Sequence, residues 1–139
     1  MKAQFDHEKL DVYQLEVNFV AWATELMVEV KQAASVSVRE PCDHLDRASL
    51  PIMFNTAEGN GERQMRGRAK FFDDARGSAT ECAACLDALV AKQACSKERV
   101  AEGKALLVRI VSVLTKLVER FSNVGQVRED GPEYIVDGE

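Results

Sequence analysis

A run of basic side chains follows a glycine-rich stretch in the middle of the chain. Five cations come directly after "AEGNGE": Arg63, Arg66, Arg68, Lys70 and Arg76. Glycines followed by cations suggest a phosphate site, but a phosphate-binding loop follows a strand, opens a helix and carries a third glycine or a Gly-Lys-Ser/Thr signal. Here the glycines come after a predicted helix, and neither signal is present. We therefore expect Gly59 to Gly61 to end that helix in the left-handed conformation and to turn the chain into the next helix.

The cations stand where the next helix is predicted to begin. The positive end of a helix macrodipole disfavours cations, so the cluster indicates an external anion or the carboxylates of a partner. A merely solvated basic end is the alternative. No aromatic residues are interleaved with these cations for base stacking, so a nucleic acid would be held by its phosphates. For Arg76, as for Arg47, Glu58 and Glu81, an ion pair inside the protein or between subunits is the alternative to such contact.

Two other patterns could carry chemistry, and neither is complete. Cys82-Ala-Ala-Cys85 is half of a zinc site, but no second pair exists and only His7 and His44 remain as further nitrogen ligands. Both cysteines fall on an apolar helix stripe, where a free thiol packs as a small hydrophobe. Bundle carboxylates such as Glu58 would need Glu-x-x-His pairs for a di-metal centre. We expect no catalytic residue, metal or cofactor.

The composition predicts one soluble helical domain. The 139 residues include 46% hydrophobic and 29% charged side chains but only three prolines, so long helices are favoured over many short strands. No secretory signal or membrane span is recognisable, and four cysteines without a disulfide framework predict a cytoplasmic protein with reduced thiols. The net charge of −5 argues against a general polyanion binder. Most of that charge lies in the last 17 residues.

Hydrophobic spacing predicts an all-α, up-down antiparallel four-helix bundle. One helix begins near Asp6 and another between Ser37 and Pro41, with a kink at Pro51. The third spans about 66–94, and the fourth begins after Ser96 and ends near residues 123–125. Residues 1–125 then form the bundle, and residues 126–139 form an acidic, flexible tail. Gly77 inside the third helix costs about 1 kcal/mol relative to alanine, which predicts close approach of a neighbouring backbone.

The first helix carries two apolar stripes instead of one. The second stripe supplies four large side chains: Leu15, Phe19, Trp22 and Leu26. A helix on the surface of a monomer needs a single stripe, so these four residues are predicted to form the interface of a homo-oligomer. The alternative is a central helix in an irregular monomer.

Three segments resemble the signatures of a known family: "FDHEKLDVYQ", "DRASLPIMFNTAEGNGE" and "KFFDDARGSATEC". The family comprises the four-helix-bundle proteins of intervening sequences in 23S ribosomal RNA genes, also called the S23 ribosomal protein family. It includes accessory proteins of diversity-generating retroelements. The resemblance implies a ring of five copies that associates with RNA or DNA and with a reverse transcriptase.

Eight positions match the motifs of the family: Arg47, Asn55, Glu58, Gly59, Arg76, Gly77, Ser78 and Glu81. The resemblance assigns a catalytic role to none of them. The accessory proteins are markedly basic, whereas this chain is acidic. A structural or protein-binding oligomer that does not bind nucleic acid is therefore the alternative function.

Overall fold

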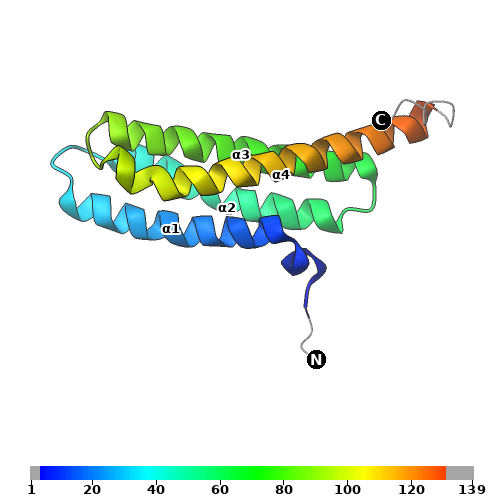
Figure 1. Ribbon diagram of the computed structural model, residues 1–139, viewed down its shortest axis with the longest axis horizontal. Helices are drawn as coiled ribbons and strands as arrows, with labels where there is room; N and C mark the ends of the chain where they lie inside the picture. Colours follow the sequence, from blue (N-terminus) through cyan, green and yellow to red (C-terminus); the bar gives the residue numbers. More distant parts are fainter. Residues whose placement is uncertain (1–3, 131–139) are drawn as a thin grey trace.

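The chain forms a bundle of four long helices, shown in the computed structural model of Figure 1. A short 3-10 helix, η1 (Asp6–Lys9), precedes α1 (Asp11–Ala33), α2 (Arg39–Gly61), α3 (Met65–Ala91) and α4 (Lys97–Asp130). The structure describes residues 4–130, with side chains up to residue 123, and this part of the chain contains no strand. Consecutive helices run in opposite directions between short loops. The predicted all-α four-helix bundle is confirmed.

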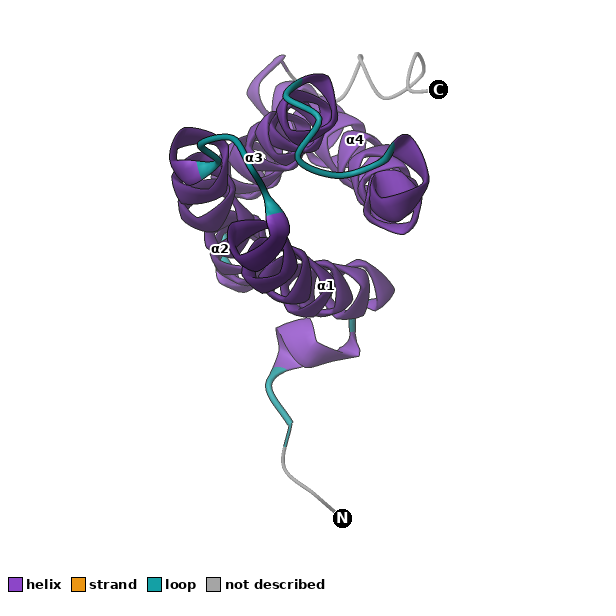
Figure 2. Ribbon diagram, turned by 90° about the vertical axis from the view of Figure 1, so that its left-hand side faces the viewer, coloured by secondary structure: helices purple, strands orange, loops and turns teal. Residues whose placement is uncertain are grey.

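The helices pack as a four-sided arrangement in chain order (Figure 2). Packing is densest between α2 and α3 and between α3 and α4, whereas α1 is held more loosely by α2 and α4. No helix in the described range is both long and apolar enough to cross a membrane. The core is built from interior-facing side chains of all four helices, among which Phe19, Ile52, Phe72 and Leu107 are almost completely buried.

The second stripe of α1 packs inside the chain. Phe19 and Leu26 are fully buried and Trp22 nearly so, while Leu15 is half-buried. A second copy therefore cannot reach Phe19, Trp22 or Leu26, which corrects their assignment to a subunit interface. The physical reason is that α1 contacts α2 on one side and α4 on the other, so a single chain uses most of the apolar surface of this helix.

Trp22 of α1 faces a glycine of α4, and this allows the two helices to approach closely. The ring of Trp22 lies against Gly103 of α4, where an added Cβ would stand only 2.1 Å from the Cζ3 atom of the ring. Above the ring, the Arg99 guanidinium is 5.5 Å from the Trp22 ring centroid, and Arg99 Nε donates to Glu29 Oε2 over 2.9 Å. Gly103 is thus the glycine that close packing requires.

Gly77 does not have that role. It is exposed, and a Cβ added there would meet nothing within 4 Å, so the predicted close approach at Gly77 is wrong. The glycines before the α2–α3 corner also differ from expectation, because neither Gly59 nor Gly61 adopts a left-handed φ. Gly59 is instead buried, with room only for the ring of Phe72, whose Cε1 would stand 2.9 Å from an added Cβ.

Helix boundaries follow local hydrogen bonding. Asp6 opens η1 and does not cap α1, and its carboxylate accepts from Asn60 Nδ2 over 2.8 Å. The third helix stops before the expected residue 94 because Gln93 has a φ of 61° and the Gln93 and Ala94 amides donate to the carbonyls of Val90 and Leu89. That pair of bonds is a Schellman cap.

The remaining boundaries lie in α2 and α4. α2 runs without interruption through Pro51. Ser96 caps α4 as predicted, since its Oγ accepts from the Arg99 amide over 3.0 Å. α4 continues to Asp130, beyond its predicted end, and residues 131–139 of the predicted tail lie outside the described residues.

Two glycine substitutions should change stability in opposite directions. Gly77→Ala should raise the free energy of unfolding by about 1 kcal/mol, because alanine is the better helix former and the new methyl group meets nothing. Gly103→Ala should lower it by about 2 kcal/mol, because the methyl group must displace Trp22. Urea unfolding followed by circular dichroism measures both, and a stabilising Gly103→Ala would contradict the packing of α1 on α4.

Candidate functional site

The α2–α3 corner is held by Glu62. Its Oε1 atom accepts from the backbone amides of Arg63 (2.8 Å) and Gln64 (3.4 Å), and its carbonyl oxygen accepts from Arg68 Nε over 2.6 Å. Gly67 leaves room for this carboxylate, because an added Cβ would stand 2.6 Å from Glu62 Cγ. The short loop between α2 and α3 is therefore a preformed turn.

Arg68 joins the corner to α4. Its guanidinium carbon lies 5.2 Å from the centroid of the Phe121 ring, and that of Arg120 lies 5.4 Å from the same centroid. Phe72 packs against Phe121 from the core, with their ring centroids 5.8 Å apart. Stacking on an aromatic face fixes the planes of the guanidinium groups and leaves their N–H groups at the surface.

Four arginines thus share one end of the bundle, and we call them the basic end: Arg63, Arg66, Arg68 and Arg120. Arg63, Arg66 and Arg120 are exposed, and Arg68 is half-buried. Three come from the corner or the first turn of α3. That first turn contains no acidic residue, but the Glu62 carboxylate accepts from amides at the start of α3 and offsets part of the positive charge of this helix end.

The other two cations predicted to contact nucleic acid have partners within α3. Lys70 Nζ lies 3.0 Å from Asp74 Oδ2, and Arg76 is paired with Asp73 while its Nη1 donates to Thr115 Oγ1 over 3.3 Å. Pairs of this kind between exposed groups are weak, but they reduce the local positive charge. Sequence reasoning missed Arg120 because helical spacing alone does not show that Phe121 and Arg68 meet.

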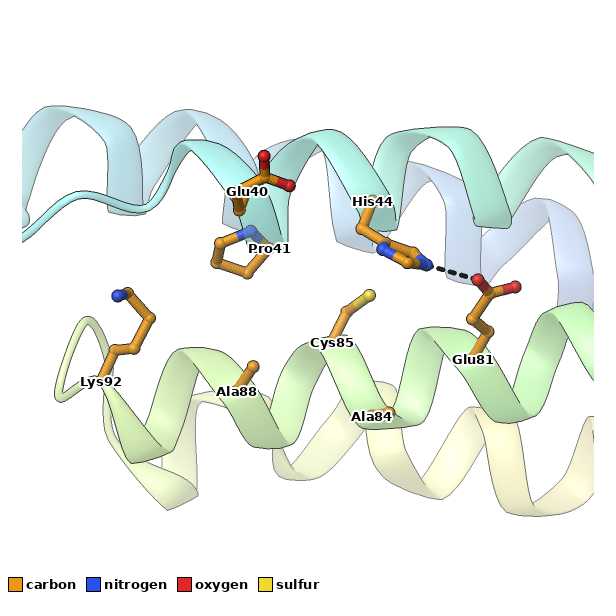
Figure 3. Close-up of a pocket in the computed structure, with 8 residues that line it drawn as sticks. All are labelled: Glu40, Pro41, His44, Glu81, Ala84, Cys85, Ala88 and Lys92. Atoms are coloured by element: carbon orange, nitrogen blue, oxygen red, sulfur yellow. Dashed lines mark hydrogen bonds and ion pairs between the residues drawn. The ribbon is translucent and has the colours of Figure 1, made fainter.

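A concave surface lies between α2 and α3, apart from the basic end (Figure 3). It has a volume of about 450 Å³, and its lining is mostly apolar between the hydrogen-bonded side chains of His44 and Glu81 and the side chain of Lys92. Glu81 therefore pairs across the two helices, as the sequence allowed. Cys85 points toward this groove, but burial raises the pKa of its thiol, which disfavours the nucleophilic thiolate.

The four cysteines are free thiols, and three of them are buried. Burial raises the pKa of Cys82 to about 12, and the pKa values of Cys42 and Cys95 are also raised. The predicted core role of Cys82 and Cys85 is confirmed. Among the side chains that the structure describes, those of residues 4–123, no three of His, Cys, Asp or Glu converge in a way that could hold a metal ion.

One acidic side chain lies in the core. Glu16 of α1 is fully buried, and its Oε2 accepts from Thr56 Oγ1 of α2 over 2.7 Å, whereas its Oε1 has no hydrogen-bond partner in the described part of the chain. Burial raises the pKa of the Glu16 carboxyl to about 8, and the bond from Thr56 only partly opposes this. The burial of Glu16 was not predicted, because the hydrophobic pattern of α1 was defined by the apolar positions on either side of it.

Comparison with known families gives a match over most of the chain. The model of the family described as 23S rRNA-intervening sequence protein matches residues 8–116. The chain belongs to this family. The match covers α1, α2, α3 and more than half of α4, and it includes the α2–α3 corner. Neither the curated proteins nor the solved structures searched for similarity gave a match.

The family assignment confirms the resemblance seen in the three signature segments. Glu16, Glu62, Arg63, Arg66 and Arg68 all fall inside the matched region. Arg120 and Phe121 lie just after it, so this family member completes its basic end with residues beyond the match.

The buried carboxyl should make stability depend on pH. Between pH 4.5 and about 8 the unfolded chain releases the Glu16 proton while the folded chain keeps it, so the free energy of unfolding falls as pH rises, by roughly 5 kcal/mol in total. Below that window both states are protonated, and above it both are ionised. Glu16→Gln should remove this slope and be the more stable protein at pH 8.

Urea unfolding of both proteins at pH 4.5, 6 and 8 measures the difference. Glu25→Gln, an exposed position on the same helix, is the matched control and should follow the wild type. Parallel pH profiles for Glu16→Gln and the wild type would contradict the burial of a neutral carboxyl.

Proposed function

We propose that this protein is a non-enzymatic accessory protein that binds the phosphate backbone of a nucleic acid through its basic end. The observation that carries the proposal is the shared contact of Arg68 and Arg120 with Phe121, which joins the α2–α3 corner to α4. Guanidinium groups match phosphate geometry, and stacked ones lose less side-chain freedom on binding. Arg63 and Arg66 lie at the same end of the bundle, in the turn held by Glu62 and in the first turn of α3.

The charge distribution supports an oriented approach. The chain has a net charge of −5, but most of that charge lies in the last 17 residues, so the bundle is close to neutral and a polyanion is attracted to it only locally. Because Lys70 and Arg76 are engaged by Asp74 and Asp73, the contact is a small one. Binding of this kind is weak, tolerant of sequence and strongly dependent on salt.

RNA is the first ligand to test. The family name refers to an intervening sequence of 23S ribosomal RNA, and duplex DNA offers the same phosphates for comparison. A ring of five copies, a reverse transcriptase as protein partner and a cytoplasmic location are further proposals that rest on the resemblance and on composition. The alternative function, a protein-binding or structural oligomer, is favoured by the apolar surfaces on α2 and between α1 and α4.

Fluorescence anisotropy with a labelled RNA hairpin and a labelled DNA duplex tests the proposal. Arg63→Ala with Arg66→Ala should weaken binding by about ten-fold and reduce the slope of log affinity against log salt by about two, because two phosphate contacts are lost. Wild-type affinity should fall by roughly ten-fold or more between 50 and 200 mM salt. Deleting residues 131–139, which carry three acidic side chains, should strengthen binding.

The matched control removes two exposed cations at the opposite end of the bundle, Arg39 and Lys97, by the same change to alanine. It should retain wild-type affinity and salt slope. Failure of the wild type and the deletion variant to bind either ligand at low salt would refute the proposal. Equal losses in the two double variants would show a diffuse charge effect and would also refute it.

A further inference from the structure

The basic end is built around an aromatic ring that comes from another helix. No aromatic residue is interleaved with Arg63, Arg66 and Arg68 in the sequence, but α4 brings Phe121 to Arg68 where it passes the α2–α3 corner (Figure 1). Phe121 is half-buried, and its ring meets that of Phe72 in the core at an interplanar angle of 31°. The core thus holds the ring in place, and the outer part of the ring stays at the surface.

Two guanidinium groups lie over this ring. Their central carbons, those of Arg68 and Arg120, are 5.2 and 5.4 Å from the ring centroid, inside the range of about 6 Å for cation–π contact. Arg68 is half-buried and donates through Nε to the carbonyl oxygen of Glu62. Arg120 is exposed and has no ion pair among the side chains of residues 4–123. The planar group of Arg120 therefore has the ring on one side and solvent on the other.

A guanidinium plane backed by an aromatic ring can stack on a nucleic-acid base. Unpaired bases in complexes with proteins stack on aromatic side chains and on arginine planes. Such stacking adds to affinity whatever the base, because every base has a flat π-face. The bases of a duplex are stacked on one another and offer that face only at the two ends. Arg120 can thus stack on a base that is unpaired, and we call Arg120 with Phe121 the stacking platform.

Phosphate contact alone would not favour an unpaired strand. A duplex carries more phosphates along its length than a single strand does, and its binding gains more for each phosphate that a cation neutralises. A site made only of cations therefore binds a duplex at least as well as a single strand. A preference for unpaired nucleotides needs a contact of another kind, and the stacking platform supplies one.

We infer that the basic end binds unpaired nucleotides, with the Arg120 guanidinium stacked between the Phe121 ring and one base while Arg63 and Arg66 contact phosphates of the same strand. The inference rests on the proposed function, which concerns phosphates alone, and adds a class of ligand to it: single-stranded RNA or DNA, or an unpaired loop. The contact is with the plane of the base and not with its edges. Binding therefore stays tolerant of sequence.

Fluorescence anisotropy with three labelled strands of about 12 nucleotides tests the platform. Two strands carry bases, oligouridylate RNA and oligothymidylate DNA, and the third is an abasic DNA strand with the same phosphates. Wild-type protein should bind both strands with bases about five-fold or more tightly than the abasic one. A gain confined to one of them would also show stacking and would identify the sugar that the site accepts. Pairing the oligothymidylate with its complement should lower its affinity, because its bases are then enclosed.

Two variants remove the platform in different ways. Arg120→Lys keeps the charge but has no plane to stack, so it should bind the oligothymidylate and the abasic strand equally and hold the abasic strand within about two-fold of the wild type. Phe121→Leu removes the ring and should shift the ratio in the same direction, provided that its circular dichroism matches the wild type. The matched control is Arg109→Lys, at an exposed position of α4 about three turns away, which should keep the wild-type ratio.

The outcomes separate this inference from the proposed function. Three results would overturn the stacking platform and leave phosphate binding standing: an abasic strand that binds as tightly as both strands with bases, an Arg120→Lys protein that keeps the wild-type ratio, or a duplex that binds as tightly as the single strand. Absence of binding to every strand at low salt would instead refute the proposed function, and this inference with it.

Discussion

The closure of α1 onto α4 through Trp22 and Gly103 is the contact on which the rest of the structure depends. The α2–α3 and α3–α4 pairs are joined by short loops and pack densely, whereas α1 is the most loosely held helix. An indole ring needs a site without a side chain opposite it, and Gly103 provides one. Once the ring is in place, Phe19 and Leu26 are enclosed, and a single chain has a complete core.

This closure also decides which surfaces remain for function. Because α1 and α4 meet at Trp22, the aliphatic groove is confined to the part of the two helices between Leu10 and Leu117. On the side of the bundle away from this groove, Phe54 of α2 is exposed. The basic end is built on the turn held by Glu62 and on the ring of Phe121, which comes about one turn after Leu117 of the groove.

Much of the fold was predictable from the sequence. The 3.6-residue spacing of apolar side chains and the Ser96 cap are local signals, and both held. The conformations at Gly59 and Gly77 were not predictable, because a glycine signals either a left-handed turn or a close neighbour, and only the neighbour decides. The sequence could not distinguish a second stripe of α1 that packs inside the chain from one that forms a subunit interface, since periodicity does not reveal how many helices cover a face.

The candidate site was predictable only in part. A cluster of cations near residue 63 is visible in the sequence, and so is its position at a helix start. Asp74 and Asp73 pair with two of these cations, Lys70 and Arg76, and helical spacing alone predicts both pairs. The contribution of Arg120 could not be predicted, because its distance from Arg68 depends on how α3 and α4 pack near Phe121.

The central claim is that phosphate groups meet the protein at the basic end. Photo-crosslinking of an RNA hairpin containing 4-thiouridine, followed by mass spectrometry of the crosslinked peptides, tests this claim most directly. The account predicts crosslinks in the segments 62–70 and 116–123, which come from different helices and meet at Phe121. Crosslinks confined to the groove between α2 and α3, near His44 and Glu81, or the absence of any crosslink at low salt, would contradict it.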